Sequence, residues 1–108
     1  MGNTAKKYDV YQAIADPTRR KVIELLAKQD LAIADITAQF SISRTAIVKH
    51  LHILSEAKLV TSQKIGREKR YALSPEPLTD VKEWIGYYER FWENKLSMLK
   101  YLVENDDK

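Results

Sequence analysis

The 108-residue sequence contains no cysteine, which excludes disulfide bonds, thiolate metal sites and thiol nucleophiles together. The absence also fits a reducing compartment, and we expect a cytoplasmic protein. Glycine is scarce, with three residues far apart, so no glycine-rich loop is available to hold a phosphate group. No nucleophile–base pairing or catalytic motif stands out. We therefore expect a protein without enzymatic activity and without a bound cofactor.

No apolar run approaches about 18 residues, the length at which a helix spans a membrane. The first nine residues, MGNTAKKYD, lack the apolar core of a signal peptide, and Lys6 stands where myristoylation requires Ser or Thr. Hydrophobic residues make up 44% of the chain and charged residues 31%, too apolar a balance for a disordered protein. This length and composition predict one folded domain over residues 1–108, with no membrane partner.

The net charge is only +3, but the charge is unevenly distributed along the chain. Residues 1–40 hold six Lys or Arg against five Asp or Glu, residues 41–70 hold seven against two, and residues 71–108 hold five against eight. The three segments therefore carry +1, +5 and −3. A basic block of this kind is typical of a surface that binds nucleic acid, although a solvated basic face has the same composition.

Apolar spacing and capping residues predict three helices in the first 40 residues. The first is a short helix over 5–15. The second covers 17–28, because Asp16 can cap it and the proline that follows fits the first helical position. The third is a short helix that runs from an Asp30 cap to Phe40.

The middle and last parts of the chain complete a recognisable order of elements. Ser43 is expected to cap a helix over 44–57, and the change of period over 59–73 predicts a two-stranded hairpin. After the proline-containing break at 74–77, one continuous helix is expected over 78–103. Two short helices joined by a three-residue turn and followed by a hairpin predict a winged helix-turn-helix. The fold is therefore mainly α, with a small β-hairpin and a long C-terminal helix.

The helix over 44–57 carries two different stripes. Ile47, Leu51 and Leu54 repeat at helical spacing and form its core stripe. The outer stripe offers a guanidinium, a hydroxyl, an ammonium and an imidazole, groups that can read base edges in the major groove of duplex DNA. Basic side chains of the hairpin lie within reach of adjacent phosphates. The residues expected to contact double-stranded DNA are Ser43, Arg44, Thr45, Val48, Lys49, His52, Lys64, Arg67, Lys69 and Arg70.

Other interpretations stay open for parts of this surface. The winged helix can also serve as a docking module for another protein, although the basic block favours DNA. His50 lies beside the core stripe, and we expect it to be packed and hydrogen-bonded rather than to read DNA. Thr18, Arg19 and Arg20 either touch phosphate or form local ion pairs with neighbouring acidic residues.

The segment 77–104 predicts a homodimer. Two heptad positions are apolar along its length, with a single Lys in them, and a second apolar row of Trp84, Phe91 and Met98 runs alongside. One small domain can cover only one of these apolar rows and leaves the other exposed. Exposed aromatic surface of this extent is not tolerated on a monomer, so a second copy is expected to cover it. The alternative is one wide stripe absorbed by the chain's own core. The expected interface residues are Tyr8, Tyr11, Leu78, Val81, Ile85, Tyr88, Trp92, Leu96, Leu99 and Leu102.

Several stretches resemble the ArsR family of bacterial winged-helix repressors. They are ADPTRRKVIELL at 15–26, DLAIADITAQFSISRTAIVKHLHILSEAKLV at 30–60 and GREKRYAL at 66–73, and YYERFWENKL in the last helix agrees with one branch of the family. The resemblance implies a homodimer that binds an inverted-repeat operator near its own promoter and leaves when a signal arrives.

The chain also departs from that family at informative positions. Val48 and Ala46 stand where the family pattern has hydroxyl residues, so polar base readout depends more on Arg44, Thr45 and Lys49. Many members bind metal or arsenite through two cysteines in the third helix, and the matching positions here are alanines, within the stretch LAIADI.

The remaining metal-binding patterns are also missing. The other common site of the family uses Asp and His on the last helix, which contains no His. His50 and His52 are two residues apart on one helix, so they point about 200° away from each other and cannot share a metal. We expect no metal site, with a sensor built on a non-standard site as the alternative, and nothing in the sequence identifies the effector.

Overall fold

The computed structural model describes residues 8–106, and its first element is a single helical turn, α1 (Val10–Ala13). Asp9 starts this turn through a capping box, because its carboxylate accepts from the Gln12 N–H at 2.8 Å and the Gln12 amide oxygen accepts from the Asp9 N–H at 2.9 Å. Helical geometry ends at Ile14. The predicted helix over 5–15 is therefore too long, and its first three residues lie outside the described part.

The second helix confirms its prediction. α2 (Pro17–Lys28) begins after Asp16, whose carboxylate accepts from the Arg19 N–H at 3.1 Å. Burial acts to raise the pKa of this carboxyl, but the N–H groups of Arg19 and Thr18 and the positive charge of Arg19 outweigh it, so the pKa lies below its ordinary value. The carboxylate is thus stabilised in the charged form that caps the helix.

The sheet has one strand more than the sequence predicts. β1 (Leu31–Ala32), β2 (Val60–Ile65) and β3 (Glu68–Leu73) form an antiparallel sheet in the order β1-β3-β2. Leu31 pairs with Tyr71, so the residues that follow Asp30 extend along β3 instead of entering a helix. The predicted hairpin is confirmed by the pairing of β2 with β3, whereas the predicted Asp30 cap is wrong because the chain after Asp30 forms a third strand.

The next helix is correspondingly short. α3 (Ile33–Thr37) starts at Ala32, which provides no side-chain cap, and it ends before Phe40. The turn that follows leads to α4 (Arg44–Glu56), which begins as predicted at a Ser43 cap, with the hydroxyl accepting from the Ala46 N–H at 3.1 Å. Together α3 and α4 form the predicted helix-turn-helix.

The C-terminal end of α4 is closed by a left-handed residue. Lys58 has a φ of 66°, its N–H donates to the Ser55 carbonyl at 3.0 Å, and the Leu59 N–H donates to the Leu54 carbonyl at 3.0 Å. This pair of bonds is a Schellman motif, in which glycine is usually the left-handed residue. The motif turns the chain directly from α4 into β2.

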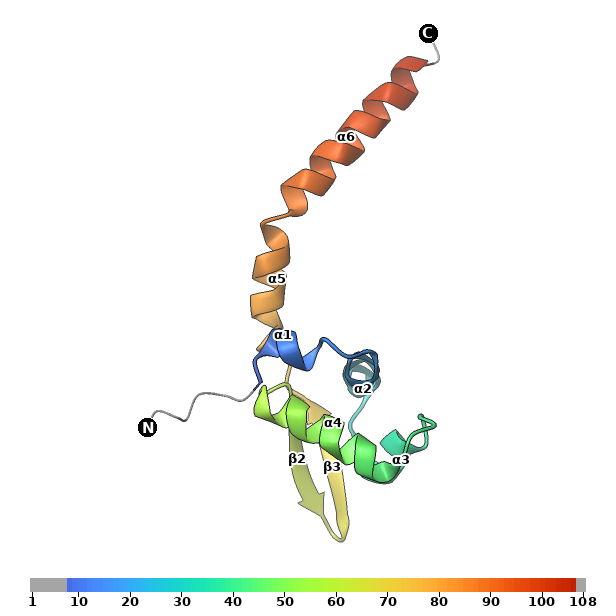
Figure 1. Cartoon of the computed structure of the whole chain (residues 1–108), viewed down its shortest axis with the longest axis vertical. Coiled ribbons are helices and arrows are strands. Elements are labelled where there is room, and N and C mark those ends of the chain that lie inside the picture. Colours follow the sequence, from blue (N-terminus) through green and yellow to red (C-terminus); the bar gives the residue numbers. More distant parts are fainter. Residues whose placement is uncertain (1–7, 107–108) are drawn as a thin grey trace, which may run out of the picture.

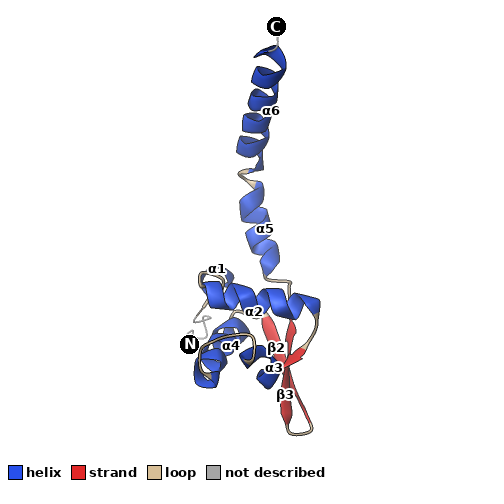
Figure 2. Ribbon diagram, turned by 90° about the vertical axis from the view of Figure 1, so that its right-hand side faces the viewer, coloured by secondary structure: helices blue, strands red, loops and turns tan. Residues whose placement is uncertain are grey.

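The core lies among α1 to α4 and the sheet, a region that we call the winged part (residues 9–73). Its fully buried large side chains are Val22, Ile36, Ile47, Leu51, Leu54 and Leu59. The three from α4 are the predicted core stripe, which is confirmed. The fold is thus a winged helix-turn-helix, mainly helical, in which β2, β3 and the turn between them form the wing (Figure 2).

The C-terminal segment is two helices rather than one. α5 (Leu78–Gly86) and α6 (Glu89–Asp106) are separated at Tyr87 and Tyr88, whose N–H groups donate three residues back, to Trp84 at 3.2 Å and Ile85 at 2.9 Å. Gly86 lowers the helix propensity at this point by about 1 kcal/mol. The predicted continuous helix is therefore wrong, and its heptad register does not run through the break.

The two helices differ in how they meet the rest of the chain. In α5, Leu78 and Val81 are half-buried against the core, whereas every α6 side chain from 89 to 105 is exposed. Both helices rise away from the winged part (Figures 1 and 2). No helix in residues 8–106 is long and apolar enough to cross a membrane.

Candidate nucleic-acid interface

The exposed side of α4 carries the residues predicted to read DNA. Arg44, Thr45, Val48, Lys49 and His52 are all exposed, and we call them the DNA-facing stripe. They are held outward because the opposite side of the helix is locked into the core. Ser43 is also exposed, and its hydroxyl accepts from the first turn, which fixes the start of the stripe.

The wing places two further cations beside this stripe. Lys64 pairs directly across the strands with Lys69, and residues opposite each other in a ladder share a face of the sheet. That face also carries Tyr71, which packs into the core. A groove of about 250 Å³ runs between α4 and this face, lined by Val48 and His52 on one side and by Ser62, Lys69 and Tyr71 on the other.

The start of α4 is electrostatically linked to the wing. Burial raises the pKa of the Tyr71 phenol above its ordinary value, and the positive charge of Arg44 offsets part of this increase. Tyr71 therefore stays neutral under the groove. Arg67 is exposed in the turn at the wing's tip, next to Gly66, whose φ of 66° is the left-handed geometry that glycine adopts freely.

Arg70 does not share the surface of the other wing cations. Side chains alternate along β3, so Arg70 and Glu68 lie on the face opposite Lys69 and Tyr71. The Arg70 guanidinium donates to the Asp30 carbonyl at 3.3 Å and lies 3.7 Å from the Glu68 carboxylate. The sequence interpretation grouped Arg70 with Lys69, whereas the structure engages Arg70 between β1 and β3.

The two histidines occupy different environments. His50 is half-buried, and its Nδ1 lies 3.2 Å from a guanidinium nitrogen of Arg19, which confirms that it is packed and hydrogen-bonded. Because arginine only donates, the His50 Nδ1 accepts. His52 is exposed, and its Nε2 lies 3.3 Å from the Glu56 carboxylate one turn later. Within the DNA-facing stripe, the His52 imidazole therefore lies beside an acidic side chain.

Arg19 and Arg20 have a structural role that the sequence reasoning missed. Arg19 donates to the carbonyls of Ala13 at 2.7 Å and Gln12 at 3.2 Å, and Arg20 donates to the Ile14 carbonyl at 2.8 Å. These carbonyls lie at the C-terminal end of α1, where helical hydrogen bonding stops, and the Gln12 carbonyl also accepts from the Ala15 N–H at 3.2 Å. The structure thus shows backbone contacts for these two side chains in place of an ion pair with a neighbouring acidic residue. The sequence signal for this role was the pair of arginines near the start of the second helix, directly after the end of the predicted first helix.

The described part of the chain offers no cluster of three or more His, Asp or Glu side chains that could hold a metal. Of the two alanines at the family's thiolate positions, Ala32 is buried in β1 and Ala34 is exposed on α3. Neither supplies a ligand atom to a metal.

Comparison with known proteins agrees with this geometry. The sequence profile described as "Bacterial regulatory protein, arsR family" matches residues 16–62. The chain is 38% identical over 77 residues to the transcriptional repressor SdpR of Bacillus subtilis, covering 71% of this chain and 86% of that protein. It is 32% identical over 96 residues to the HTH-type transcriptional regulator Rv2034 of Mycobacterium tuberculosis, covering 89% and 87%. The chain belongs to the ArsR family.

Solved structures of the ArsR family share the fold. An ArsR-like transcriptional regulator from Rhodococcus sp. RHA1 superposes with a TM-score of 0.68 at 30% identity, covering 89% of this chain and 88% of the other. ArsR-family proteins bind DNA and typically form homodimers. This chain is accordingly a DNA-binding transcriptional regulator of the ArsR family and not an enzyme.

Proposed function

We propose that the protein is a homodimeric repressor that recognises an inverted repeat in double-stranded DNA. In this proposal α4 enters the major groove with the DNA-facing stripe, and Lys64, Arg67 and Lys69 of the wing contact phosphates beside it. The observation that carries it is the groove that joins the stripe to the Lys69 face of the wing. One duplex can touch both surfaces at once. An operator on the chromosome implies action in the cytoplasm.

The Lys64–Lys69 pair supports a phosphate contact at the wing. Two like charges directly opposite in an antiparallel ladder destabilise the sheet when nothing lies between them. Neither ammonium group forms an ion pair within residues 8–106. A phosphate oxygen between the two would remove this repulsion and gain two charge-assisted hydrogen bonds. The repulsion between the two ammonium groups thus destabilises the wing in the absence of DNA, and its removal on binding would add to the affinity for DNA.

The exposed apolar surface of the C-terminal helices supports the dimer. Tyr11, Trp84, Tyr88 and Phe91 form a continuous series of ring contacts from α1 to α6, with centroids 5.9, 5.5 and 6.2 Å apart. The Tyr11 hydroxyl also donates to the Asp80 carbonyl at 2.9 Å. These contacts order the surface but leave it open to solvent. The proposed interface keeps the ten residues named above, as separate sets on α5, α6 and the chain around α1 rather than as one continuous heptad stripe. Leu78 and Val81 in this set are shared with the chain's own core.

Selection of DNA fragments with the purified protein, followed by binding measurements on the selected site, tests this function. If a dimer covers about eight phosphates, log K against log salt concentration should have a slope near −7. We expect an inverted repeat in the selected fragments. A slope flatter than about −3, or equal affinity for single strands, would contradict the proposal.

A further inference from the structure

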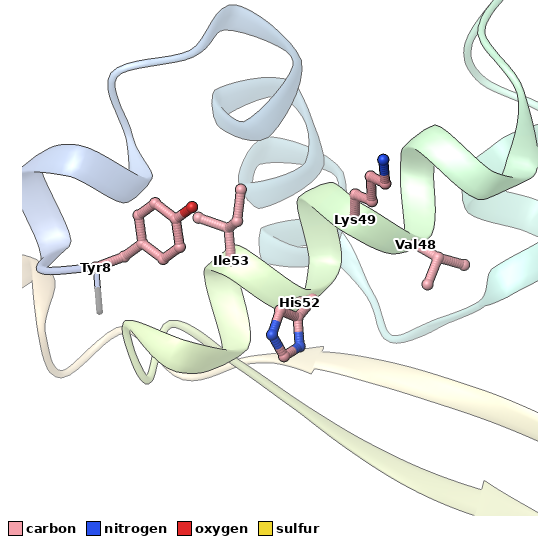
Figure 3. Close-up of a pocket in the computed structure, with 5 residues that line it drawn as sticks. All are labelled: Tyr8, Val48, Lys49, His52 and Ile53. Carbon is pink, nitrogen blue, oxygen red and sulfur yellow. The ribbon is translucent and has the colours of Figure 1, made fainter. Parts of the chain in front are cut away.

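A pocket of about 380 Å³ opens beside the DNA-facing stripe. Four of its lining residues come from α4, namely Val48, Lys49, His52 and Ile53, and the fifth is Tyr8, from the chain just before α1 (Figure 3). The volume falls within the range of small-molecule sites in proteins, about 300–1,000 Å³. The pocket is separate from the groove between α4 and the wing, although Val48 and His52 line both.

The walls of this pocket are mainly apolar. Val48 is 45% exposed, Ile53 is half-buried with part of its side chain packed on the core, and the Tyr8 ring stands beside Ile53 (Figure 3). Water in such a pocket finds few hydrogen-bond partners, so an apolar body of matching size displaces it favourably.

The positive charge of Lys49 at the rim of the pocket indicates which polar group a ligand would carry. The Lys49 ammonium is exposed and forms no ion pair with any residue from 8 to 106. His52 is engaged with Glu56, and the Glu56 carboxylate disfavours a ligand that carries two or more negative charges. A single anionic group at Lys49, attached to an apolar body against Tyr8, Val48 and Ile53, satisfies both constraints.

We propose that this pocket binds a small apolar monocarboxylate and that its occupancy releases DNA. The second half rests on the proposed function, since Val48, Lys49 and His52 are residues proposed to contact DNA. A ligand that covers them and a duplex that reads them compete for the same atoms. The effect is therefore direct competition and needs no conformational change.

Methyl NMR of the full-length protein tests the pocket independently of DNA. With 2-naphthylacetate as the probe, we expect saturable shifts of the Val48 and Ile53 methyl signals. The uncharged 2-naphthylacetamide should bind about threefold more weakly, the scale of one exposed ion pair. Lys49→Met should remove this difference. No saturable shift at millimolar probe, or equal affinity of both probes for the wild type, would overturn the proposal.

Substitutions of matched chemistry locate the site. Ile53→Trp fills the pocket and should lower probe affinity at least about tenfold. Ile23→Trp, at a half-buried isoleucine that lines a different pocket beside α2, should leave it unchanged. Tyr8→Ala removes one wall and should also weaken the probe if Ile53→Trp does not fold. Sedimentation velocity of this variant checks that its dimer is intact, because Tyr8 is also among the proposed interface residues. Unchanged affinity in both Ile53→Trp and Tyr8→Ala would mean that the probe binds elsewhere, and the proposal would be wrong.

Anisotropy of a fluorescein-labelled duplex separates the two proposals. The probe should release the duplex from the wild type and from Ile23→Trp but not from Ile53→Trp. A probe that saturates the pocket without releasing DNA would overturn the regulatory role. A protein that binds no duplex even without the probe would instead refute the proposed function, while the NMR result on the pocket would stand.

Discussion

Helices α4 and α6 are both amphipathic, yet only α4 has its apolar side covered within the chain. On α4, Ile47, Leu51 and Leu54 are at most 1% exposed. On α6, Trp92 is 52% exposed and Leu96 65%. The same periodicity thus leads to a packed core in one helix and to an uncovered surface in the other.

The difference between the helices lies in their neighbours. α4 is enclosed by α2, α3 and the sheet, so each apolar side chain is removed from water as the winged part folds. α6 begins beyond the break at Tyr87 and Tyr88 and points away from every other element (Figure 1). Burying a side chain the size of Leu or Phe is worth about 1.5–3 kcal/mol. That free energy is already used in α4, and in α6 it is available to a second copy of the chain.

The largest effect is expected from a charge on the uncovered side of α6. Trp92→Lys puts an ammonium into the proposed interface, where it finds no partner. We expect a monomer by sedimentation velocity and a loss of DNA affinity on the order of 100-fold, equivalent to about 2.7 kcal/mol. Asn94→Lys adds the same charge about 200° around the helix and should stay dimeric. A wild-type protein that sediments at 12.5 kDa at micromolar concentration would refute the dimer.

A substitution at Arg19 tests how much its hydrogen bonds between α1 and α4 stabilise the winged part. Arg19→Ala removes the donor that joins two α1 carbonyls to His50 of α4, and it should lower the free energy of unfolding in urea by about 1.5–3 kcal/mol. Arg20→Ala removes one bond from an exposed guanidinium and should cost less than about 1 kcal/mol. Equal losses would mean that the Arg19 contacts do not connect α1 to α4.

The two basic surfaces are distinguished by sequence preference. Arg44→Ala should cost about 1–3 kcal/mol on the selected site and relax the preference for it. Arg67→Ala should weaken all sequences alike and make the salt slope shallower by about 1. Binding isotherms on selected and scrambled duplexes measure both effects. Identical behaviour of the two variants would contradict the division between a reading helix and a phosphate-binding wing.

The C-terminal end of α4 offers a smaller and stabilising change. Lys58→Gly relieves the left-handed strain of a residue that carries a Cβ, while the unfolded chain gains entropy. The net effect should be an increase of about 0.5–1 kcal/mol in the free energy of unfolding, read as a higher Tm. Lys21→Gly, at an exposed position inside α2, should lower the Tm by comparison. A fall in Tm for Lys58→Gly would show that the left-handed geometry carries no strain.

Thiophilic metals should have no effect at all. The chain has no cysteine, and alanines stand at both thiolate positions of the family site. Micromolar zinc, cadmium or arsenite should therefore leave the protein–DNA complex intact in an anisotropy assay. Release that a chelator reverses would reveal a site of a different kind.

Local patterns made much of the fold predictable. Asp16 and Ser43 each precede a helical apolar period, so the starts of α2 and α4 follow from neighbouring residues alone. β1 was missed because two residues show no period and its partner Tyr71 is 40 positions away. The break after Gly86 was missed because a single glycine in a strongly apolar pattern is ordinarily tolerated.

The candidate site shows the same division between local and distant causes. The exposure of the DNA-facing stripe follows from the position of Ile47 and Leu51 on the other side of the helix. The separation of Arg70 from Lys69 follows from strand alternation, and the apolar ring of Tyr71, two residues after Lys69, could have shown which face of β3 meets the core. The pocket at Tyr8 depends on how the chain before α1 meets α4, which no spacing in the sequence encodes.

The break at Tyr87 and Tyr88 makes α6 a lever. Eighteen residues at 1.5 Å each give an arm of about 27 Å, so a rotation of about 10° at the break displaces its far end by about 5 Å. Successive base pairs are about 3.4 Å apart. In the proposed dimer, where the α6 helices of two copies are joined, a rotation of about 7° at this joint corresponds to a displacement of one base-pair step at the end of the arm. The angle between α5 and α6 therefore sets the distance at which the two winged parts of such a dimer stand on DNA.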